Sequence, residues 1–151
     1  MITFNDSEWP LLTVSFSGTS SAQEFEAYLA RMTAYLNRRE TYLAILDSSK
    51  ASNAPTLEQR QRQVEWLQKH DAALRQRSLG SAFVITSPFI RLALNIMCQL
   101  KPLSCPHTIV GDMKVARAWA AERFQAARLP LPFLLLRNGE GLAATGTQGP
   151  R

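Results

Sequence analysis

The chain has 151 residues, 46% of them hydrophobic, which suits one domain with a sizeable core and excludes a largely disordered protein. Two cysteines are too few for a disulfide scaffold, and their spacing matches no zinc-binding pattern. The net charge of +5 comes from arginines and lysines scattered along predicted helices, with no run longer than a pair, which argues against nucleic-acid binding.

The N-terminal segment, MITFNDSEWPLLTVSFSG, carries acidic residues where a signal peptide would carry basic ones. No apolar run in the chain approaches the ~20 residues that are needed to span a bilayer. We therefore expect no transmembrane segment and a cytoplasmic location.

The first predicted strand and helix lie between residues 11 and 39. In LLTVSFSG (residues 11–18) hydrophobic and polar residues alternate, which is the pattern of a half-buried strand. Ser21 and Glu24 have the spacing of a capping box, and an amphipathic helix is predicted from there to about Arg39.

The second strand is predicted at residues 41–47, TYLAILD, whose continuous apolar run is typical of a central strand covered on both faces. A polar loop is predicted at residues 48–55. Thr56 and Gln59 form a second capping box, and one unbroken helix is predicted from Thr56 to Arg77.

The third and fourth strands are likewise each followed by a predicted helix. GSAFVIT (residues 80–86) predicts another buried strand, and Ser87 followed by Pro88 is a strong helix start. CPHTIVGD (residues 105–112) predicts the fourth strand, with Asp112 as the N-cap of the last helix.

After the last helix, FLLL (residues 133–136) is predicted to form a short edge strand or to dock on the body of the protein. Residues 138–151 are small and polar and are predicted to be a disordered tail. One domain is therefore expected at residues 1–137. The alternation of four strands with four helices predicts an α/β fold with a mostly parallel sheet flanked by helices.

The order of these elements resembles that of the SpoIIAA-like proteins, which are relatives of the STAS domain and belong near the Sec14 lipid-binding fold. The resemblance covers residues ~10 to 127 and is carried by LLTVSFSG, EFEAYLARMTAYL, YLAILDSS, GSAFVITSPFIRLALNIM and HTIVGDMKVARAWAAER. It implies a small bacterial α/β domain that binds a partner or a ligand, usually without catalysis.

In STAS-type antagonists a strand that ends in L-D-L-S is followed by a helix start, D-S-S/T-G, whose serine is phosphorylated. Here LDSS matches the strand end, with Asp47 and Ser49 in place, whereas SNAPT replaces the second motif. Thr56 lies nearest to the switch position. The resemblance therefore implies Thr56 and Ser49 as candidate phosphorylation sites.

Candidate binding residues lie where the predicted strands end, because ligands of open α/β sheets bind at the carboxyl ends of the strands. These ends lead into helix N-termini, which favour anions. The alternative is that the same residues only cap helices or form turns. The candidates at these ends are Asp47, Ser48, Ser49, Lys50, Thr56, Ser87 and Asp112.

The second predicted helix adds Arg60 and Trp66. Trp66 lies beside the apolar stripe of the helix, so it either flanks the core or is an exposed anchor for a partner. The two histidines, His70 and His107, form no recognisable catalytic or metal-binding arrangement, and no cofactor or metal site is predicted.

These observations predict a non-catalytic regulatory or scaffolding module that binds a partner protein through the second helix and the loop before it. The first alternative is a Sec14-type carrier that holds a lipid or a small anionic ligand between sheet and helices. The second alternative is an enzyme of unrecognised type. A homodimer through an edge strand or through LPFLLL (residues 131–136) is also left open.

Overall fold

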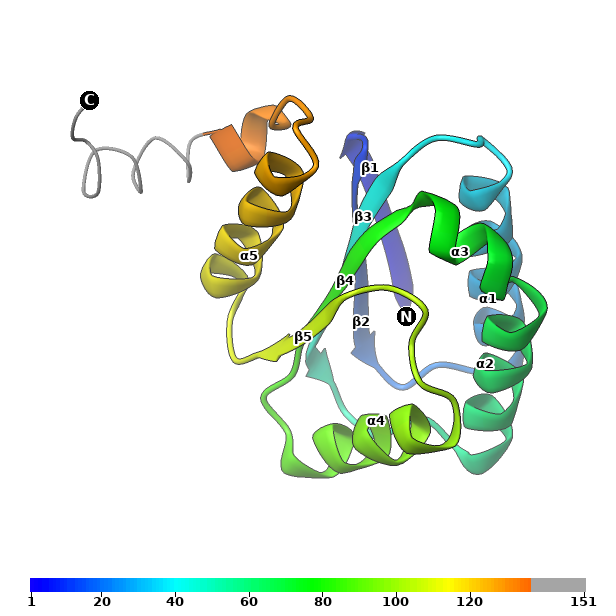
Figure 1. Cartoon of the computed structure of the whole chain (residues 1–151). Helices are drawn as coiled ribbons and strands as arrows, with labels where there is room; N and C mark the ends of the chain where they lie inside the picture. The colour runs from blue at the N-terminus through cyan, green and yellow to red at the C-terminus, as the bar shows by residue number, and fades with distance from the viewer. Residues whose placement is uncertain (137–151) are drawn as a thin grey trace.

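The computed structural model describes residues 1–136, which form a five-stranded sheet flanked by helices (Figure 1). The strands lie in the order in which they occur in the chain. All neighbouring strands are parallel except the first pair, which is antiparallel. The strands are β1 (Ile2–Glu8), β2 (Leu11–Gly18), β3 (Tyr42–Ala51), β4 (Ser78–Val84) and β5 (His107–Val110).

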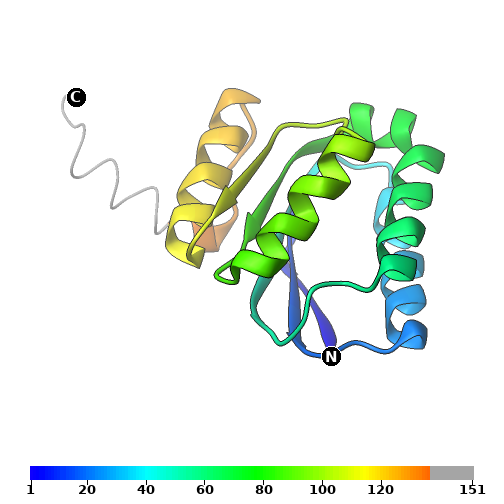
Figure 2. The ribbon, with the colours of Figure 1, turned by 90° about the horizontal axis from the view of Figure 1, so that it is seen from below.

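Four helices cover one face of the sheet and one covers the other (Figures 1 and 2). Each crossover between parallel strands leads to the next strand in the same direction, so right-handed crossovers place their helices on a single face. Within residues 1–136 no strand follows α5, and this helix packs on the opposite face. The helices are α1 (Ala22–Leu36), α2 (Leu57–Lys69), α3 (Asp71–Arg77), α4 (Pro88–Leu100) and α5 (Met113–Ala126).

The helix starts predicted from the sequence are confirmed. Ser21 with Glu24 forms a reciprocal capping box at α1, and Thr56 forms one with Gln59 at α2. At α4 the Ser87 hydroxyl accepts a hydrogen bond from a backbone N–H of the first turn, and Pro88 is the first helical residue. The carboxylate of Asp112 caps α5 in the same way. These short-range signals give every long helix its start.

Two predicted boundaries are wrong. The residues predicted as a loop after Asp47 continue β3 to Ala51, because they pair with the end of β2. The long second helix is broken at His70 into α2 and α3. The break turns α3 over the end of α1, where the Arg77 guanidinium donates a hydrogen bond to the Leu36 carbonyl.

The two ends of the chain also differ from the expectation. Strand β1 was not predicted from the sequence, although its side chains alternate between exposed and half-buried positions. At residues 133–136 the edge-strand alternative is wrong: the segment forms a helical turn, and Leu135 is buried against the core under α5. The predicted tail at 138–151 lies outside the described residues.

The sheet separates two hydrophobic cores, and the pleat of β3 contributes to both. Leu43 and Ile45 point to the face that α5 covers, whereas Tyr42, Ala44 and Leu46 point to the face of α1 and α2. This continuous apolar strand is covered on both sides, as the sequence pattern predicted.

Candidate functional site: an apolar cavity under α4

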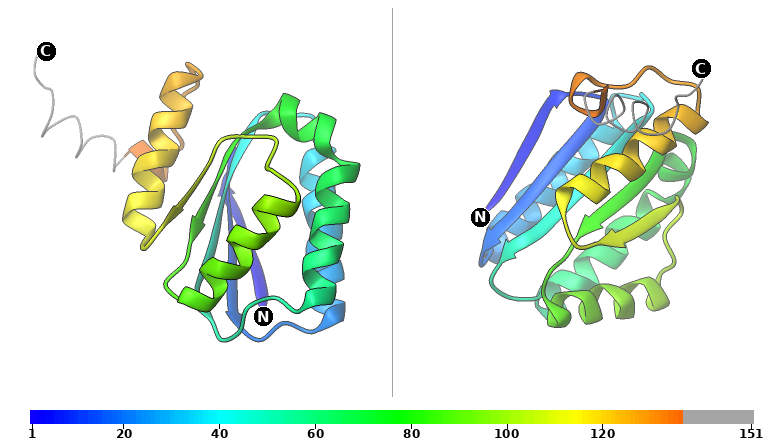
Figure 3. Two further views of the ribbon diagram at one scale, coloured as in Figure 1. Left: turned by 60° about the horizontal axis from the view of Figure 1, so that its bottom comes forward. Right: turned by 90° about the vertical axis from the view of Figure 1, so that its left-hand side faces the viewer.

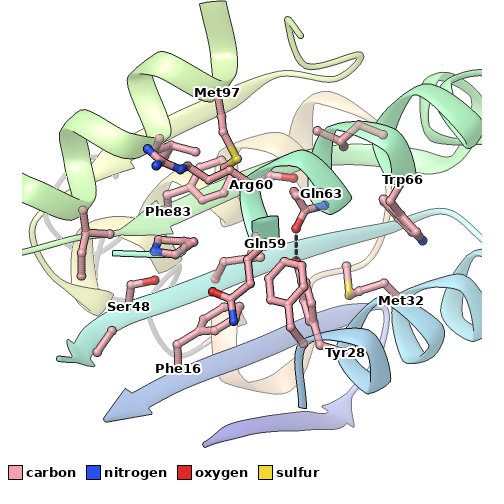
Figure 4. Close-up of a pocket in the computed structure, with 18 of the residues that line it drawn as sticks. Phe16, Tyr28, Met32, Ser48, Gln59, Arg60, Gln63, Trp66, Phe83 and Met97 are labelled. Carbon is pink, nitrogen blue, oxygen red and sulfur yellow. Dashed lines mark hydrogen bonds between the residues drawn. The ribbon is translucent and has the colours of Figure 1, made fainter. Parts of the chain in front are cut away.

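A cavity of about 270 Å³ lies between the sheet and helices α1, α2 and α4 (Figure 4). Its floor is the sheet face formed by β2, β3 and β4. The apolar residues that line it include Phe16, Phe25, Tyr28, Met32, Tyr42, Ala44, Leu46, Trp66, Leu67, Leu74, Phe83, Ile85, Ile90, Leu94 and Met97. A cavity of about 150 Å³ suffices for a benzene-sized guest, so this one has room for a larger organic molecule.

The cavity lies on the face whose helices pack less closely on the strands. α5 on the opposite face lies close against β4, whereas α4 meets the sheet through side chains, with Ile90 and Leu94 packed against Phe83 and Ile109. The floor beneath α4 also contains two small side chains, Ala44 and Ser81, in adjacent positions on β3 and β4. Small side chains on the floor leave volume that no other element fills.

The cavity extends along α4 and reaches the surface at the carboxyl ends of the strands. There its lining includes the exposed residues Gly18, Thr19, Asn53 and Thr56, from the loops after β2 and β3. At the other end of α4 it is lined by residues 103–105. α4 has 13 residues and is therefore about 20 Å long.

Arg60 is a charged group of this cavity without a partner. Its Nε is buried and has no hydrogen-bond partner among the described residues. Arg117 and Arg123 share this feature, but neither lines the cavity. None of the described lining residues is acidic. An unpaired buried N–H costs free energy, and an anionic group in the cavity would remove that cost.

Other polar side chains of the lining are paired within the protein. The Tyr28 hydroxyl donates to Gln63 Oε1 at 3.0 Å (Figure 4), and Gln59 Nε2 donates to the Ser20 carbonyl at 3.1 Å. Burial raises the pKa of Tyr28, which therefore stays a neutral phenol. The Nε of Arg60, by contrast, is buried without a partner among the described residues.

At the end of the cavity near residues 103–105, two lining residues, Lys101 and Ser104, bond to Asp71. Its carboxylate accepts hydrogen bonds from the Ser104 hydroxyl, from Arg75 and from Lys101, which lines the cavity. These bonds, that from Ser104 above all, lower the pKa of Asp71. The cluster ties α3 to the end of α4 and to the segment before β5.

Four of the nine candidate residues line the cavity: Ser48, Thr56, Arg60 and Trp66. Asp47, Ser49 and Lys50 belong to the same stretch of β3 as Ser48 but do not line it; the Asp47 carboxylate accepts a hydrogen bond from the Ser49 backbone N–H. Ser87 and Asp112 lie elsewhere, as helix caps. The structure brings together only part of the predicted strand-end site.

The surface-anchor alternative for Trp66 is wrong. Its side chain is only 8% exposed, and its indole N–H donates a hydrogen bond to Thr33 Oγ1 at 2.9 Å. Nearby basic side chains on the outer surface are engaged as well: Arg62 pairs with Glu26 and Glu65. Trp66 is thus a wall of the cavity, and α2 presents no aromatic anchor to a partner.

The predicted phosphorylation sites and the partner protein stay predictions. Thr56 is exposed, and its hydroxyl accepts a hydrogen bond from the Gln59 backbone N–H. Ser49 is half-buried in β3. Thr56 caps α2, and Ser49 is part of β3.

Most of the cavity-lining residues were missed by the sequence analysis, which looked for polar residues at strand ends. The useful signal was the segment SPFIRLALNIMCQL, because α4 is apolar around most of its circumference and must therefore face something apolar on more than one side. Phe83 and Met97 are examples of residues that only tertiary contacts assign to the site (Figure 4).

No protein-family model, no curated protein and no solved structure matches this chain. The resemblance to SpoIIAA-like proteins therefore remains a prediction. None of the helices within residues 1–136 is both long and apolar enough to cross a membrane. In the same residues, no group of three or more His, Cys, Asp or Glu side chains is placed to hold a metal ion.

Proposed function

We propose that this protein is a binding protein for a small amphiphile, whose apolar chain lies in the cavity under α4 and whose anionic end lies at Arg60. The observation that carries the proposal is the combination of an apolar cavity of about 270 Å³ with a buried, unpartnered Arg60 Nε in its lining. An apolar pocket with a few polar groups that orient the ligand is the usual form of a small-molecule site.

The chemistry of the lining selects the ligand class. Aromatic and aliphatic side chains favour a hydrocarbon chain, and each methylene that leaves water contributes about 0.8 kcal/mol. Arg60, which is unpaired, and the lack of acidic residues among the described lining favour a negative charge. A carboxylate or phosphate ester on an aliphatic chain satisfies both requirements.

The size of the cavity limits the ligand. Pockets that enclose drug-sized molecules measure roughly 300–1,000 Å³, and this cavity is slightly smaller. A single chain fits better than a lipid with two chains, unless part of the ligand remains at the open end near Thr56. The proposal is thus the carrier alternative of the sequence analysis, restricted to single-chain anionic amphiphiles.

Native mass spectrometry of the purified protein gives the first test. Extra mass that disappears on denaturation would support the proposal and give the mass of the ligand. If only the polypeptide mass is found, dodecanoate is added and binding is measured by calorimetry. The proposal is abandoned if neither experiment detects a bound amphiphile.

The role of Arg60 is tested with two probes that share a chain, dodecanoate and dodecanol. We expect Arg60→Met to weaken dodecanoate binding about tenfold, since a charge-assisted hydrogen bond is worth roughly 1.5–3 kcal/mol, and to leave dodecanol binding within a factor of about two. Arg62→Met is the matched control, because Arg62 lies on the same helix but is paired with Glu26 and Glu65. Equal losses for both probes would show that Arg60 only supports the cavity wall.

A further inference from the structure

The cavity lining contains a second buried polar group without a partner, the hydroxyl of Tyr42. Tyr42 lines the cavity and is only 1% exposed. Its hydroxyl makes no hydrogen bond to any of the described residues, whereas the hydroxyl of Tyr28 is bonded to Gln63. The ring of Tyr42 is stacked on Trp9, with ring centroids 5.4 Å apart and 12° between the planes, so its position is set by the fold. An unpaired hydroxyl at a buried position costs free energy unless a guest bonds to it.

Two more polar side chains of the lining lie beside Tyr42. The Ser81 hydroxyl has only a sulfur contact, to the Cys105 thiol at 3.9 Å, which is a weak hydrogen bond. Burial raises the pKa of Tyr42, and charge repulsion from Cys105 adds to this effect, so the phenol is near the thiol and stays a neutral donor. Tyr42, Ser81 and Cys105 thus form a polar cluster with unused hydrogen-bonding capacity.

This polar cluster and Arg60 lie toward opposite ends of the cavity. β3 begins at Tyr42, and the segment between α4 and β5, which includes Cys105, passes the end of the sheet where the parallel strands begin (Figure 3). Arg60 lies in the first turn of α2, which follows the carboxyl end of β3. Tyr42 and Ser48 both line the cavity and are six positions apart on β3, which is about 20 Å of extended strand. A chain that runs along the floor therefore meets a polar group toward each end.

The chemistry at Tyr42 suits an uncharged oxygen better than a second anion. Lys101 also lines the cavity at this end, but its ammonium is bonded to the Asp71 carboxylate at 3.0 Å. Neutral hydroxyls such as those of Tyr42 and Ser81 do not compensate a buried charge, whereas they can donate to a hydroxyl or a carbonyl oxygen.

We propose that the ligand of the cavity has two polar ends: an anionic group at Arg60 and, at the far end of its chain, a hydroxyl or carbonyl oxygen that hydrogen-bonds to Tyr42 and Ser81. This inference rests on the proposed function, since it places the anionic end of the ligand at Arg60. It narrows the ligand class to single-chain anionic amphiphiles that are oxygenated at the other end. A site built around such bonds disfavours the plain chain, because its own polar groups are then left unpaired.

Calorimetry with ω-hydroxy acids, from ω-hydroxyoctanoate to ω-hydroxytetradecanoate, tests the proposal, and each is compared with the unsubstituted acid of the same length. A hydroxyl that enters an apolar cavity without a partner should weaken binding about tenfold or more. We expect instead that one chain length brings the hydroxyl to Tyr42, and that this acid binds about two- to tenfold more tightly than its unsubstituted counterpart.

Tyr42→Phe should reverse this preference, because it leaves the hydroxyl of the ligand unpaired. The unsubstituted acid should bind Tyr42→Phe within about threefold of the wild type, which also shows that the cavity is intact. Tyr35→Phe is the matched control: Tyr35 is a buried tyrosine whose hydroxyl donates to Asp6, and it does not line the cavity. This variant should keep the wild-type preference for the hydroxy acid.

The results separate this inference from the proposed function. If hydroxylation weakens binding equally in the wild type and in Tyr42→Phe at every length, the inference is wrong, while binding of the unsubstituted acids still supports the proposed function. Equal loss of the preference in Tyr35→Phe also overturns the inference, as does tighter binding of the dicarboxylate of the favoured length. If no acid binds at all, the proposed function fails together with the inference.

Discussion

On one face of the sheet α5 lies directly on the strands, whereas on the other face α1, α2 and α4 enclose a cavity of about 270 Å³. The close approach of α5 depends on small residues: Ala116, Ala120 and Ala121 are all at most 1% exposed. Gly80 contributes as well, since a Cβ there would lie 2.6 Å from Cη2 of Trp119.

The two faces are expected to contribute differently, the α5 face to stability and the α4 face to ligand binding. A face packed at the density of a crystal gains dispersion energy from every side chain. A face that keeps a cavity gives up part of this gain, as binding sites commonly do. We therefore expect the α5 face to respond strongly to changes of volume and the α4 face to respond mainly in its ligand affinity.

The largest effect is expected for Phe124→Ala. Phe124 is a fully buried residue of α5, so its truncation should lower the free energy of unfolding by about 3–5 kcal/mol. Phe83→Ala is the counterpart on the cavity side; because Phe83 already borders empty space, its cost should be less than half as large. Urea denaturation of both variants provides the measurement, and equal costs would contradict the difference between the faces.

The next effect comes from added volume. Ala120→Leu inserts three carbons under α5 and should destabilise the protein by about 1–3 kcal/mol. Ala44→Leu makes the same change at a residue of the cavity floor, where space is free. Its stability should stay within about 1 kcal/mol of the wild type, while dodecanoate binding is lost. Thermal unfolding compares the two variants, and a large loss for Ala44→Leu would mean that the cavity is too small for a ligand.

A smaller effect is expected for Trp66→Phe. The ring is kept in the cavity wall, but the hydrogen bond to Thr33 is lost, which should cost about 1 kcal/mol. In the double variant Trp66→Phe/Thr33→Val neither partner is left unpaired, so part of this loss should be recovered. Additive losses in denaturant titrations would show that the hydrogen bond has no role.

The smallest effect concerns acid stability. The pKa of Asp71 is lowered in the folded protein, chiefly by the hydrogen bond from Ser104. Its contribution to stability is therefore complete above the unfolded-state pKa near 3.8 and is lost as the pH falls toward the folded-state value. Asp71→Asn should thus flatten the fall in melting temperature below about pH 4. A melting curve series from neutral to acidic pH tests this, and parallel curves for variant and wild type would count against it.

Much of the fold could be predicted because its signals are short-range. Capping boxes at Ser21 and Thr56 join residues three positions apart, and the apolar run of β3 shows directly that both of its sides are covered. The break at His70 escaped prediction since the apolar pattern continues through it. After the break, α3 is held by contacts with distant segments, those of Arg77 with Leu36 and of Asp71 with Ser104.

The candidate site was predicted only in part, for the same reason. Thr56 was found because helix starts are recognisable in the sequence, and Arg60 because it lies on the helix predicted to bind a partner; both line the cavity. The sequence did not decide whether Trp66 is a core residue or a surface residue, because one helix does not show what packs beside it. Its burial became clear only from Thr33, 33 positions away in the chain.

By itself, the sequence determined the α/β class, the parallel strands and the helix starts, because these depend on residue periodicity and on hydrogen bonds between near neighbours. The tertiary structure alone decided that α5 packs tightly on one face of the sheet, and that a cavity with Arg60 in its lining lies on the other face, beneath α1, α2 and α4. A cavity depends on the distances between elements, which result from how side chains of distant segments fill the space between them.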